Sequence, residues 1–303
     1  MNREEVCWCF KSQISNIESQ ILNLKSQTSN LKPQILNLKS QILKPLSTFN
    51  IIASLLGGLV LLFVVAPIVG MVLATPLSAL VSTAKEPEVT GSIWLTLWVS
   101  MAATLVFAVA AIPLAYLLAR RSFWGKRLVL GVIDLPVVIP HSAAGIAILG
   151  FIARDSVMGK TASIFGVSLV GTPAAIALAM AFVSLPFLIN AAREGFAAVP
   201  ERLEKAALNL GASPARVFFT ISLPLAWKAI LSGLVMMFAR GMSEFGAVVI
   251  VAYHPMITPV LIFERFGAFG LKYARPVSVI FIGVCLAVFV VIRLIAKREV
   301  KDA

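Results

Sequence analysis

Residues 93–119 read IWLTLWVSMAATLVFAVAAIPLAYLLA and contain no charged side chain. Crossing the roughly 30 Å of hydrocarbon in a bilayer takes about 20 mainly apolar residues in a helix that rises about 1.5 Å per residue. The apolar residues are continuous and do not alternate with polar ones, as they would in a half-buried strand. A bilayer also leaves the backbone of an open sheet without hydrogen-bond partners. This stretch is therefore expected to be a membrane-spanning helix.

Five more stretches have the same character. With the first, they lie at residues 51–74, 93–119, 128–152, 172–192, 229–252 and 276–296. The composition agrees, because 59% of the 303 residues are hydrophobic, 13% are charged and the mean hydropathy is +0.94, which is not typical of a soluble domain. The sequence predicts an all-α membrane protein with six transmembrane helices in residues 51–298, followed by a short tail at 299–303.

Lys and Arg are distributed unevenly among the segments between these stretches. Six lie before residue 51, four lie in residues 120–127, five lie in residues 193–228 and four lie after residue 292, whereas the three intervening loops hold six in all. Because basic residues accumulate on the cytoplasmic side of a membrane, we expect both termini to face the cytoplasm. The formal net charge of +12 then reflects topology and affinity for membrane lipid, and not binding to nucleic acid.

Residues 1–50 form a polar tail with a seven-residue repeat that begins at Ile14. One interpretation is the seam of a coiled coil, and the other is a short duplicated stretch that is disordered or weakly helical. Thr28, Pro33 and Pro45 interrupt the repeat, which favours the second interpretation. The apolar positions of the seam are Ile14, Ile17, Ile21, Leu24, Leu31, Ile35 and Leu38.

A long polar segment, residues 193–228, separates the fourth and fifth apolar stretches. Its centre reads VPERLEKAALNLGASPARVFFTISLP from Val199 to Pro224. Gly211 suits the left-handed residue that follows a helix end, and Ser213 with Pro214 suits a new N-cap and first turn. We expect a short helix, a sharp turn and a second short helix that ends before the Leu-Pro pair at the end of this segment.

The first of these short helices has features of a docking surface. Ala206 and Ala207 have small side chains, so another protein could approach the backbone closely. Glu204 is well placed for an external cation or backbone amide. Any helical hairpin between two spans could carry the same residues, however, so this pattern alone leaves a purely structural hairpin as the alternative.

Seven residues at fixed spacing in this segment match the pattern E-x-A-A-x(3)-G-x(9)-I-x-L-P. The pattern resembles the cytoplasmic EAA loop of permease subunits of ABC importers, and the resemblance implies a type I importer permease fold. In that family the first helix of the loop sits in a cleft on the ATPase subunit and transmits its closure to the membrane helices. The resemblance assigns this coupling role to Glu204, Ala206, Ala207, Gly211, Ile221, Leu223 and Pro224.

Two further stretches, DLPVVIPHSAAGIA at 134–147 and ARGMSEFGA at 239–247, resemble the molybdate and tungstate permeases of archaea and, more distantly, sulfate permeases. The similarity covers most of residues 50–298 and implies import of oxyanions across the plasma membrane of a prokaryote. It also implies three kinds of partner: a second copy of the chain, two cytoplasmic ATP-binding subunits and an extracytoplasmic oxyanion-binding protein. ATP and Mg²⁺ would bind to the ATPase, with no cofactor on this chain.

One stretch imitates a nucleotide-binding site. Residues 158–161 resemble the last part of the phosphate-binding loop G-x-x-x-x-G-K-[ST]. Arg154, however, occupies the position of the first glycine that this motif requires. The sequence shows no paired nucleophile and base, and Cys7, Cys9 and Cys285 do not have the spacing of metal ligands. We therefore expect a transport subunit and not an enzyme.

Several polar features interrupt the apolar stretches. Pro136 and Pro140 remove backbone hydrogen bonds from the third predicted span, so this helix is expected to be kinked or opened beside a cavity. Ionisable groups inside a span are costly and normally face the interior of a bundle, unless they can reach the surface as Arg293 can. The candidates for a translocation path or internal ion pairs are Asp134, His141, Ser142, Arg240, Ser243 and Glu244.

Structural explanations compete with a transport role for these residues. Arg240 and Glu244 are four residues apart on one helical face and could neutralise each other, and Asp134 is a second possible counter-ion for Arg240. His141 could be a neutral ring bonded to a backbone carbonyl. The serines could donate weakly to a passing oxyanion.

Two alternatives for the function stay open. The same kind of importer could carry sulfate, thiosulfate or another anion. An ion-coupled secondary transporter belongs to another class, and such proteins usually show internal symmetry between their halves. No such internal similarity is seen in this sequence.

Overall fold

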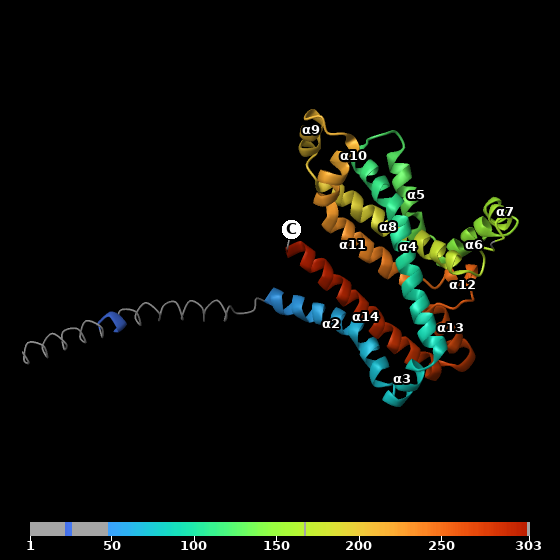
Figure 1. Cartoon of the computed structure of the whole chain (residues 1–303). Helices are drawn as coiled ribbons and strands as arrows, with labels where there is room; N and C mark the ends of the chain where they lie inside the picture. The colour runs from blue at the N-terminus through green and yellow to red at the C-terminus, as the bar shows by residue number, and fades with distance from the viewer. Residues whose placement is uncertain (1–21, 26–47, 167, 302–303) are drawn as a thin grey trace, which may run out of the picture. The chain divides into compact units, whose positions relative to one another are not determined.

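The structure is a computed structural model that divides into two compact units, residues 1–69 and residues 70–303 (Figure 1). It describes residues 22–25, 48–166 and 168–301. The seven-residue repeat of the tail lies outside the described residues, apart from residues 22–25. The side chain of Arg293 and those of residues 295–301 also lie outside the description.

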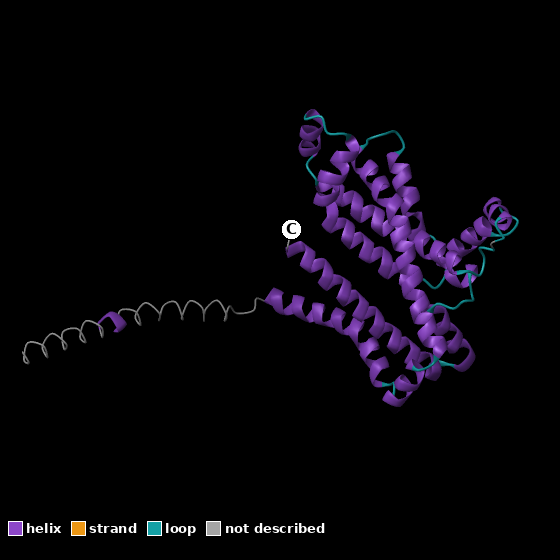
Figure 2. Ribbon diagram, viewed as in Figure 1, coloured by secondary structure: helices purple, strands orange, loops and turns teal. Residues whose placement is uncertain are grey.

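Helices and loops make up the described residues, which contain no strand (Figure 2). The helices are α2 (Thr48–Leu73), α3 (Leu77–Ala84), α4 (Pro87–Arg120), α5 (Lys126–Val138), α6 (His141–Ile152), α7 (Val157–Ile164), α8 (Pro173–Ala198), α9 (Glu201–Asn209), α10 (Pro214–Val217), the π-helical segment η1 (Phe218–Ser222), α11 (Leu223–Met242), α12 (Val248–Val251), α13 (Thr258–Phe269) and α14 (Leu271–Lys301).

Five helical segments of the described chain are long and apolar enough to cross a membrane. They are Thr48–Leu73, Pro87–Arg120, Pro173–Ala198, Pro214–Met242 and Leu271–Ile292. The bent pair of α5 and α6 makes a sixth if it is counted as one span. The prediction of an all-helical membrane protein is therefore confirmed, with five or six spans.

The third predicted span is broken, as its prolines indicated. The chain bends by 111° between α5 and α6. Pro136 lies inside α5 and Pro140 is the N-cap residue of α6. Because proline has no N–H and its ring crowds the preceding turn, the helix ends here and restarts at His141.

The fifth span differs from the prediction at its beginning. The sequence predicted a short helix ending before Leu223 and a separate span at 229–252, but the helix runs without interruption from Pro214 to Met242. The π-helical segment η1 explains the continuity. The Leu223 amide donates to the Phe218 carbonyl, five residues back, and this wider turn accommodates Pro224 at the start of α11 without a break.

The same span also ends ten residues earlier than predicted, at Met242 and not at residue 252. The Glu244 side chain accepts a hydrogen bond from the Ala247 amide at 2.9 Å. Ser243 Oγ donates to the Arg240 carbonyl at 3.1 Å. Such local side-chain bonds compete with helical backbone bonds, and the chain therefore turns before the short helix α12.

Small residues bring α8 and α11 close together at the centre of residues 70–303. A Cβ added at Gly195 in α8 would lie 2.5 Å from the Ala229 Cβ, and one added at Gly233 in α11 would lie 2.9 Å from the Ala191 Cβ. In a bilayer, van der Waals packing at such close distances drives helices to associate. Burial of apolar surface does not, because lipid is as apolar as the side chains. Helix α4 runs beside them from the α3 end of this unit to the α9 end (Figure 1).

Gly145 provides a test of the packing between α6 and α12. A Cβ at this position would lie 2.9 Å from the Ala247 carbonyl oxygen, a backbone atom that cannot swing away. We expect Gly145→Ala to destabilise the protein by about 1 to 3 kcal/mol through overpacking, measured as a lower unfolding temperature in detergent. The control is Gly150→Ala in the same helix, where the new Cβ meets nothing within 4 Å. Equal unfolding temperatures for the two variants would contradict this packing.

Candidate functional site

The hairpin between α8 and α11 has the helix, turn and helix that the sequence predicted. Helix α9 ends before Gly211, whose φ is +88°, a left-handed conformation that glycine adopts with least strain. Ser213 then caps α10 by accepting a hydrogen bond from the Arg216 amide. The difference from the prediction lies after α10, where the second helix continues into the span.

Glu204 points into the protein, which corrects the external cation or amide predicted for it. Its side chain is 9% exposed. Arg120, the last residue of α4, donates from Nε and Nη2 to the two carboxylate oxygens over 2.6 to 3.0 Å. Ser222 Oγ donates to Oε1 at 2.7 Å, and Tyr116 Oη donates to Oε2 at 3.4 Å. The carboxylate therefore ties α9 to α4 and to η1.

Arg120 also fixes the end of α8, because its Nη2 donates to the Val199 carbonyl at 3.0 Å. The Tyr116 ring packs edge-on against Phe196 and Phe218, with centroids 5.3 and 5.0 Å apart. Forked pairs between arginine and a carboxylate are strong and directional, and poor access of water strengthens them. The root of the hairpin is thus a nearly dry polar network with aromatic rings beside it.

Sequence reasoning missed three members of this network, Arg120, Tyr116 and Ser222. It counted Arg120 as a sign of topology and did not consider Ser222, which is fully buried in the unmarked position between Ile221 and Leu223. The available signal was the position of an arginine at the end of a span, one turn after Tyr116 on the same helical face.

The other residues of the seven-residue motif lie away from the carboxylate. Ala206 is exposed and Ala207 half-buried on α9, Ile221 and Leu223 are half-buried, and Pro224 is exposed. Two leucines of α9, Leu203 and Leu208, are 42% and 43% exposed. Helix α9 therefore leaves small and apolar side chains uncovered on its surface.

Three ionisable residues predicted inside the spans lie together where α6, α11 and α12 meet. Glu244 is 1% exposed, and its Oε2 lies 2.9 Å from Arg240 Nη2. His141 Nδ1 lies 3.6 Å from the same carboxylate oxygen, and His141 Nε2 lies 2.9 Å from Arg240 Nη2. The predicted ion pair between Arg240 and Glu244 is therefore present, with His141 beside both partners.

The His141 ring contacts both members of the ion pair. Arg240 Nη2 lies 2.9 Å from Nε2 and 3.4 Å from Nδ1. Nδ1 also lies 3.6 Å from Glu244 Oε2. The backbone carbonyl partner predicted for this histidine is wrong. Gly246 makes the approach possible, because a Cβ there would lie 2.6 Å from the His141 Cβ.

Asp134 does not join this cluster. Its Oδ1 accepts a hydrogen bond from Asn190 Nδ2 in α8 at 2.6 Å, so Asn190 is its partner and Arg240 is not. Asn190 was missed because an uncharged amide in an apolar run attracts little attention, although polar residues inside spans are informative. Ser142 and Ser243 are exposed, and Ser243 is bonded to the carbonyl of Arg240.

The cluster of His141, Arg240 and Glu244 is open on one side. The His141 side chain is 44% exposed and that of Arg240 is 24% exposed. Ionisable groups inside a span normally face a water-filled cavity or another protein surface. The described residues contain no group of three or more His, Cys, Asp or Glu side chains that could hold a metal ion.

Residues 111–300 match the family described as the binding-protein-dependent transport system inner membrane component. The chain belongs to this family. It is therefore a multi-pass membrane subunit of a transport system, as expected, and not an enzyme. Membership excludes the ion-coupled transporter and implies an ATPase and a binding protein as partners.

Similar proteins include permeases named for oxyanions. The chain is 42% identical over 247 residues to the molybdate/tungstate transport system permease protein WtpB of Pyrococcus abyssi, covering 80% of this chain and 94% of that protein. WtpB of Methanocaldococcus jannaschii is 39% identical, with coverage of 84% and 99%. The sulfate transport system permease protein CysT of Synechocystis is 28% identical, with coverage of 78% and 85%.

Among solved structures, a bacterial ABC transporter that imports alginate superposes with a TM-score of 0.67 at 17% sequence identity. The match covers 85% of this chain and 99% of that one. At this identity the likeness concerns the fold alone, and the fold is that of ABC importer permeases.

Arg120→Gln tests the network around Glu204. The change leaves a buried carboxylate without its charged partner, which costs about 3 to 5 kcal/mol in a dry site. We expect the hairpin to loosen while the spans stay folded, so amide hydrogen exchange should rise in α9 and not in α8. The control is Lys205→Gln. This lysine forms an exposed pair with Glu201 and lowers the pKa of that carboxyl by hydrogen bonding to it, and such pairs contribute little to stability. Unchanged exchange in α9 of the Arg120 variant would contradict the clamp.

A double-mutant cycle tests the pair of Arg240 and Glu244. Arg240→Gln strands a buried acid, at a cost of about 3 to 5 kcal/mol if the pair is dry. Adding Glu244→Gln removes the stranded charge and should recover much of the stability. Stability and transport are both measured for the two single variants and the double variant. A single Arg240→Gln protein that is fully stable but does not transport would place Arg240 in the path, and the ion-pair explanation would fail.

Proposed function

We propose that this chain is the membrane permease subunit of an ATP-driven importer for molybdate or tungstate. The observation that carries the proposal is the identity of 39 to 42% to permeases of that name along 94 to 99% of their length. A sulfate permease is less similar, at 28%, which makes sulfate, thiosulfate or another anion the second candidate. Molybdate and tungstate are tetrahedral dianions of nearly equal size, so we assign the choice between them to the binding protein.

Coupling to the ATPase is assigned to the hairpin. The uncovered small and apolar side chains of α9 suit a cleft on another protein, whereas Glu204 holds the helix in place from within. The seven motif residues keep the coupling role that the resemblance implies, with Glu204 as a positioning residue. ATP and Mg²⁺ bind to the ATPase subunits. The continuous helix from Pro214 to Met242 connects the docking surface to the cluster at Arg240.

We assign the other half of the translocation path to a second copy of the chain. His141 and Arg240 are partly exposed within segments that lie in the membrane, and such groups need a cavity or a protein neighbour. A homodimer provides both on a two-fold axis. Because an importer must release its cargo to the cytoplasm, a tight site on the way would oppose transport. We therefore assign Arg240 mainly to its pair with Glu244, which leaves a weak positive field.

The substrate is tested by reconstituting the chain with its ATPase and binding protein. We expect the binding protein loaded with molybdate or tungstate to stimulate ATP hydrolysis, because delivery of cargo to the outer face is what drives the cycle in a binding-protein-dependent importer. The unloaded binding protein is the control. Stimulation by the sulfate-loaded form alone would overturn the substrate assignment.

The orientation is tested by labelling single cysteines in intact cells. The distribution of Lys and Arg supports cytoplasmic termini and a cytoplasmic hairpin. Cysteines at Lys85, Lys160 and Lys272 should therefore react with an impermeant thiol reagent, whereas cysteines at Arg121 and Lys205 should not. Permeabilised cells provide the control for reactivity. Labelling at position 205 without labelling at position 85 would invert the orientation.

A further inference from the structure

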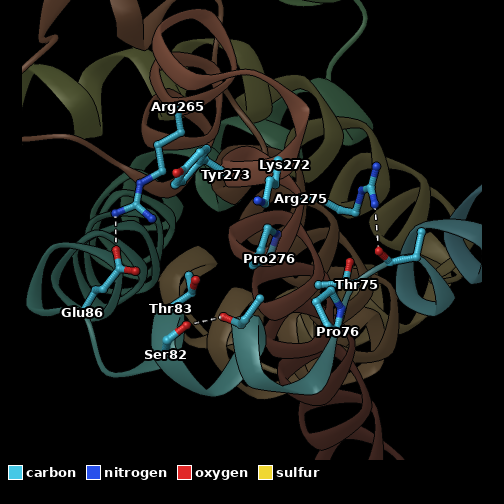
Figure 3. A pocket seen from close by; sticks show the side chains of 12 residues that line it. Thr75, Pro76, Ser82, Thr83, Glu86, Arg265, Lys272, Tyr273, Arg275 and Pro276 are labelled. Atoms are coloured by element: carbon cyan, nitrogen blue, oxygen red, sulfur yellow. Dashed lines mark hydrogen bonds and ion pairs between the residues drawn. The ribbon is translucent and has the colours of Figure 1, made fainter.

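A cavity of about 480 Å³ lies beside the side chains that Figure 3 labels. Helix α3, which contributes to it, lies at the end of the second unit that is remote from α9 (Figure 1). The walls of the cavity are formed by the segment after α2, helix α3, Glu86 just before α4, Arg265 of α13 and the first turns of α14. Helix α4 separates it from the hairpin, with Glu86 before its first residue at the cavity and Arg120 as its last residue at the hairpin. The cavity therefore has no part in the coupling site or in the cluster at Arg240.

The charged residues that line the cavity differ in how they are paired. They are Glu86, Arg265, Lys272 and Arg275, and Glu88 contacts Arg265 as well. Both acids bind to one cation, since Arg265 Nη2 lies 2.5 Å from Glu86 Oε2 and 2.9 Å from Glu88 Oε2. Arg265 is thus neutralised by acids, whereas the two basic residues of α14 form no ion pair among the described residues.

These two basic residues, Lys272 and Arg275, extend from α14 at the cavity (Figure 3). Arg275 donates from Nη1 to the Ala74 carbonyl at 2.8 Å and has no acid beside it among the described residues. The side chain of Lys272 makes no hydrogen bond or ion pair within the part of the chain that the structure describes. Two positive charges are thus available to an anion at this site.

An uncharged donor on the opposite wall is also available. Thr83 lines the cavity, is 7% exposed, and its hydroxyl has no hydrogen-bond partner among the described residues. The neighbouring hydroxyls of Thr75 and Ser82 are bonded to backbone carbonyls at 2.8 and 3.0 Å. The Thr83 hydroxyl is therefore free to donate a hydrogen bond to a ligand with acceptor oxygens.

Exposed apolar side chains are next to the lining residues of this cavity in the sequence. Leu73 is 81% exposed, Leu77 is 74% exposed and Leu271 is 55% exposed. They flank the lining residues at positions 74 to 76 and 272 to 276. Basic side chains with large apolar neighbours at the end of a span are typical of the boundary between hydrocarbon and lipid headgroups.

We propose that the cavity binds the phosphodiester group of a phospholipid. Lys272 and Arg275 hold the anionic oxygens, Thr83 donates a hydrogen bond, and the acyl chains lie along Leu73 and Leu77. The exposed leucines next to these cations in the sequence favour an anion that carries acyl chains over a free tetrahedral dianion such as the proposed cargo. The lipid site does not depend on the transport proposal, because it shares no residue with the hairpin or the intramembrane cluster.

The test compares lipid retention by the full-length protein in detergent, measured by native mass spectrometry during titration with phosphatidylglycerol. We expect Lys272→Gln to bind this lipid about fivefold more weakly, the effect of one basic residue near a membrane surface. Lys272→Arg should restore binding, and Thr83→Val should weaken it without changing the charge. The matched control is Lys85→Gln, which removes an exposed lysine at the same end of the unit that does not line the cavity.

Inorganic phosphate and tungstate serve as competing probes, because a free anion offers the same oxygens without acyl chains. Lipid binding that persists in an excess of either anion supports the proposal. Displacement of the lipid by an equal concentration of phosphate or tungstate would show a free-anion site and overturn it. Equal lipid binding by the native protein and Lys272→Gln would overturn it as well.

Discussion

Hydrocarbon offers no hydrogen-bond partner, and this constraint governs where the polar groups of the protein lie. The backbone forms its hydrogen bonds within helices. Three acids of the candidate sites each have a specific side-chain partner. Glu204 is held by Arg120, Glu244 by Arg240, and Asp134 by Asn190. In each pair the partners come from different helices or from the two sides of a helix end. The polar contacts therefore fix the arrangement of the helices as well as their own positions.

Much of the fold could be predicted because the relevant signals are local. Long apolar runs place the spans, Pro136 and Pro140 break the third span, and Gly211 takes the left-handed conformation required after α9. The fifth span was placed wrongly at its end because the apolar run continues past the residues that end the helix. It was placed wrongly at its beginning because the π-helical segment carries the helix through Pro224. A carboxylate that accepts a bond from the backbone three residues later does not change hydropathy, so a hydropathy reading cannot detect it.

The partners of the candidate site residues could not be predicted for a different reason. Arg120 and Glu204 are 84 residues apart, and His141 and Arg240 are 99 residues apart. Sequence reasoning recognised the motif that contains Glu204 but assigned its carboxylate to an external partner, because the pairing depends on the packing of α9 against α4. The ion pair between Arg240 and Glu244 could be predicted because its partners are four residues apart in the sequence. Contacts between residues far apart in the sequence can be identified only from the structure.

The uninterrupted helix that begins in the hairpin has a mechanical consequence. It contains 29 residues from Pro214 to Met242, about 43 Å at 1.5 Å per residue. Such a rod acts as a lever with one arm at the membrane surface and the other beside the intramembrane charges. A tilt of about 5° at one end would displace the other end by roughly 4 Å over this length. The π-helical turn near its base keeps the chain helical on both sides of Pro224. Because Glu204 of α9 is bonded to Ser222 in this helix, a movement of α9 would be carried along the helix toward the surroundings of Glu244.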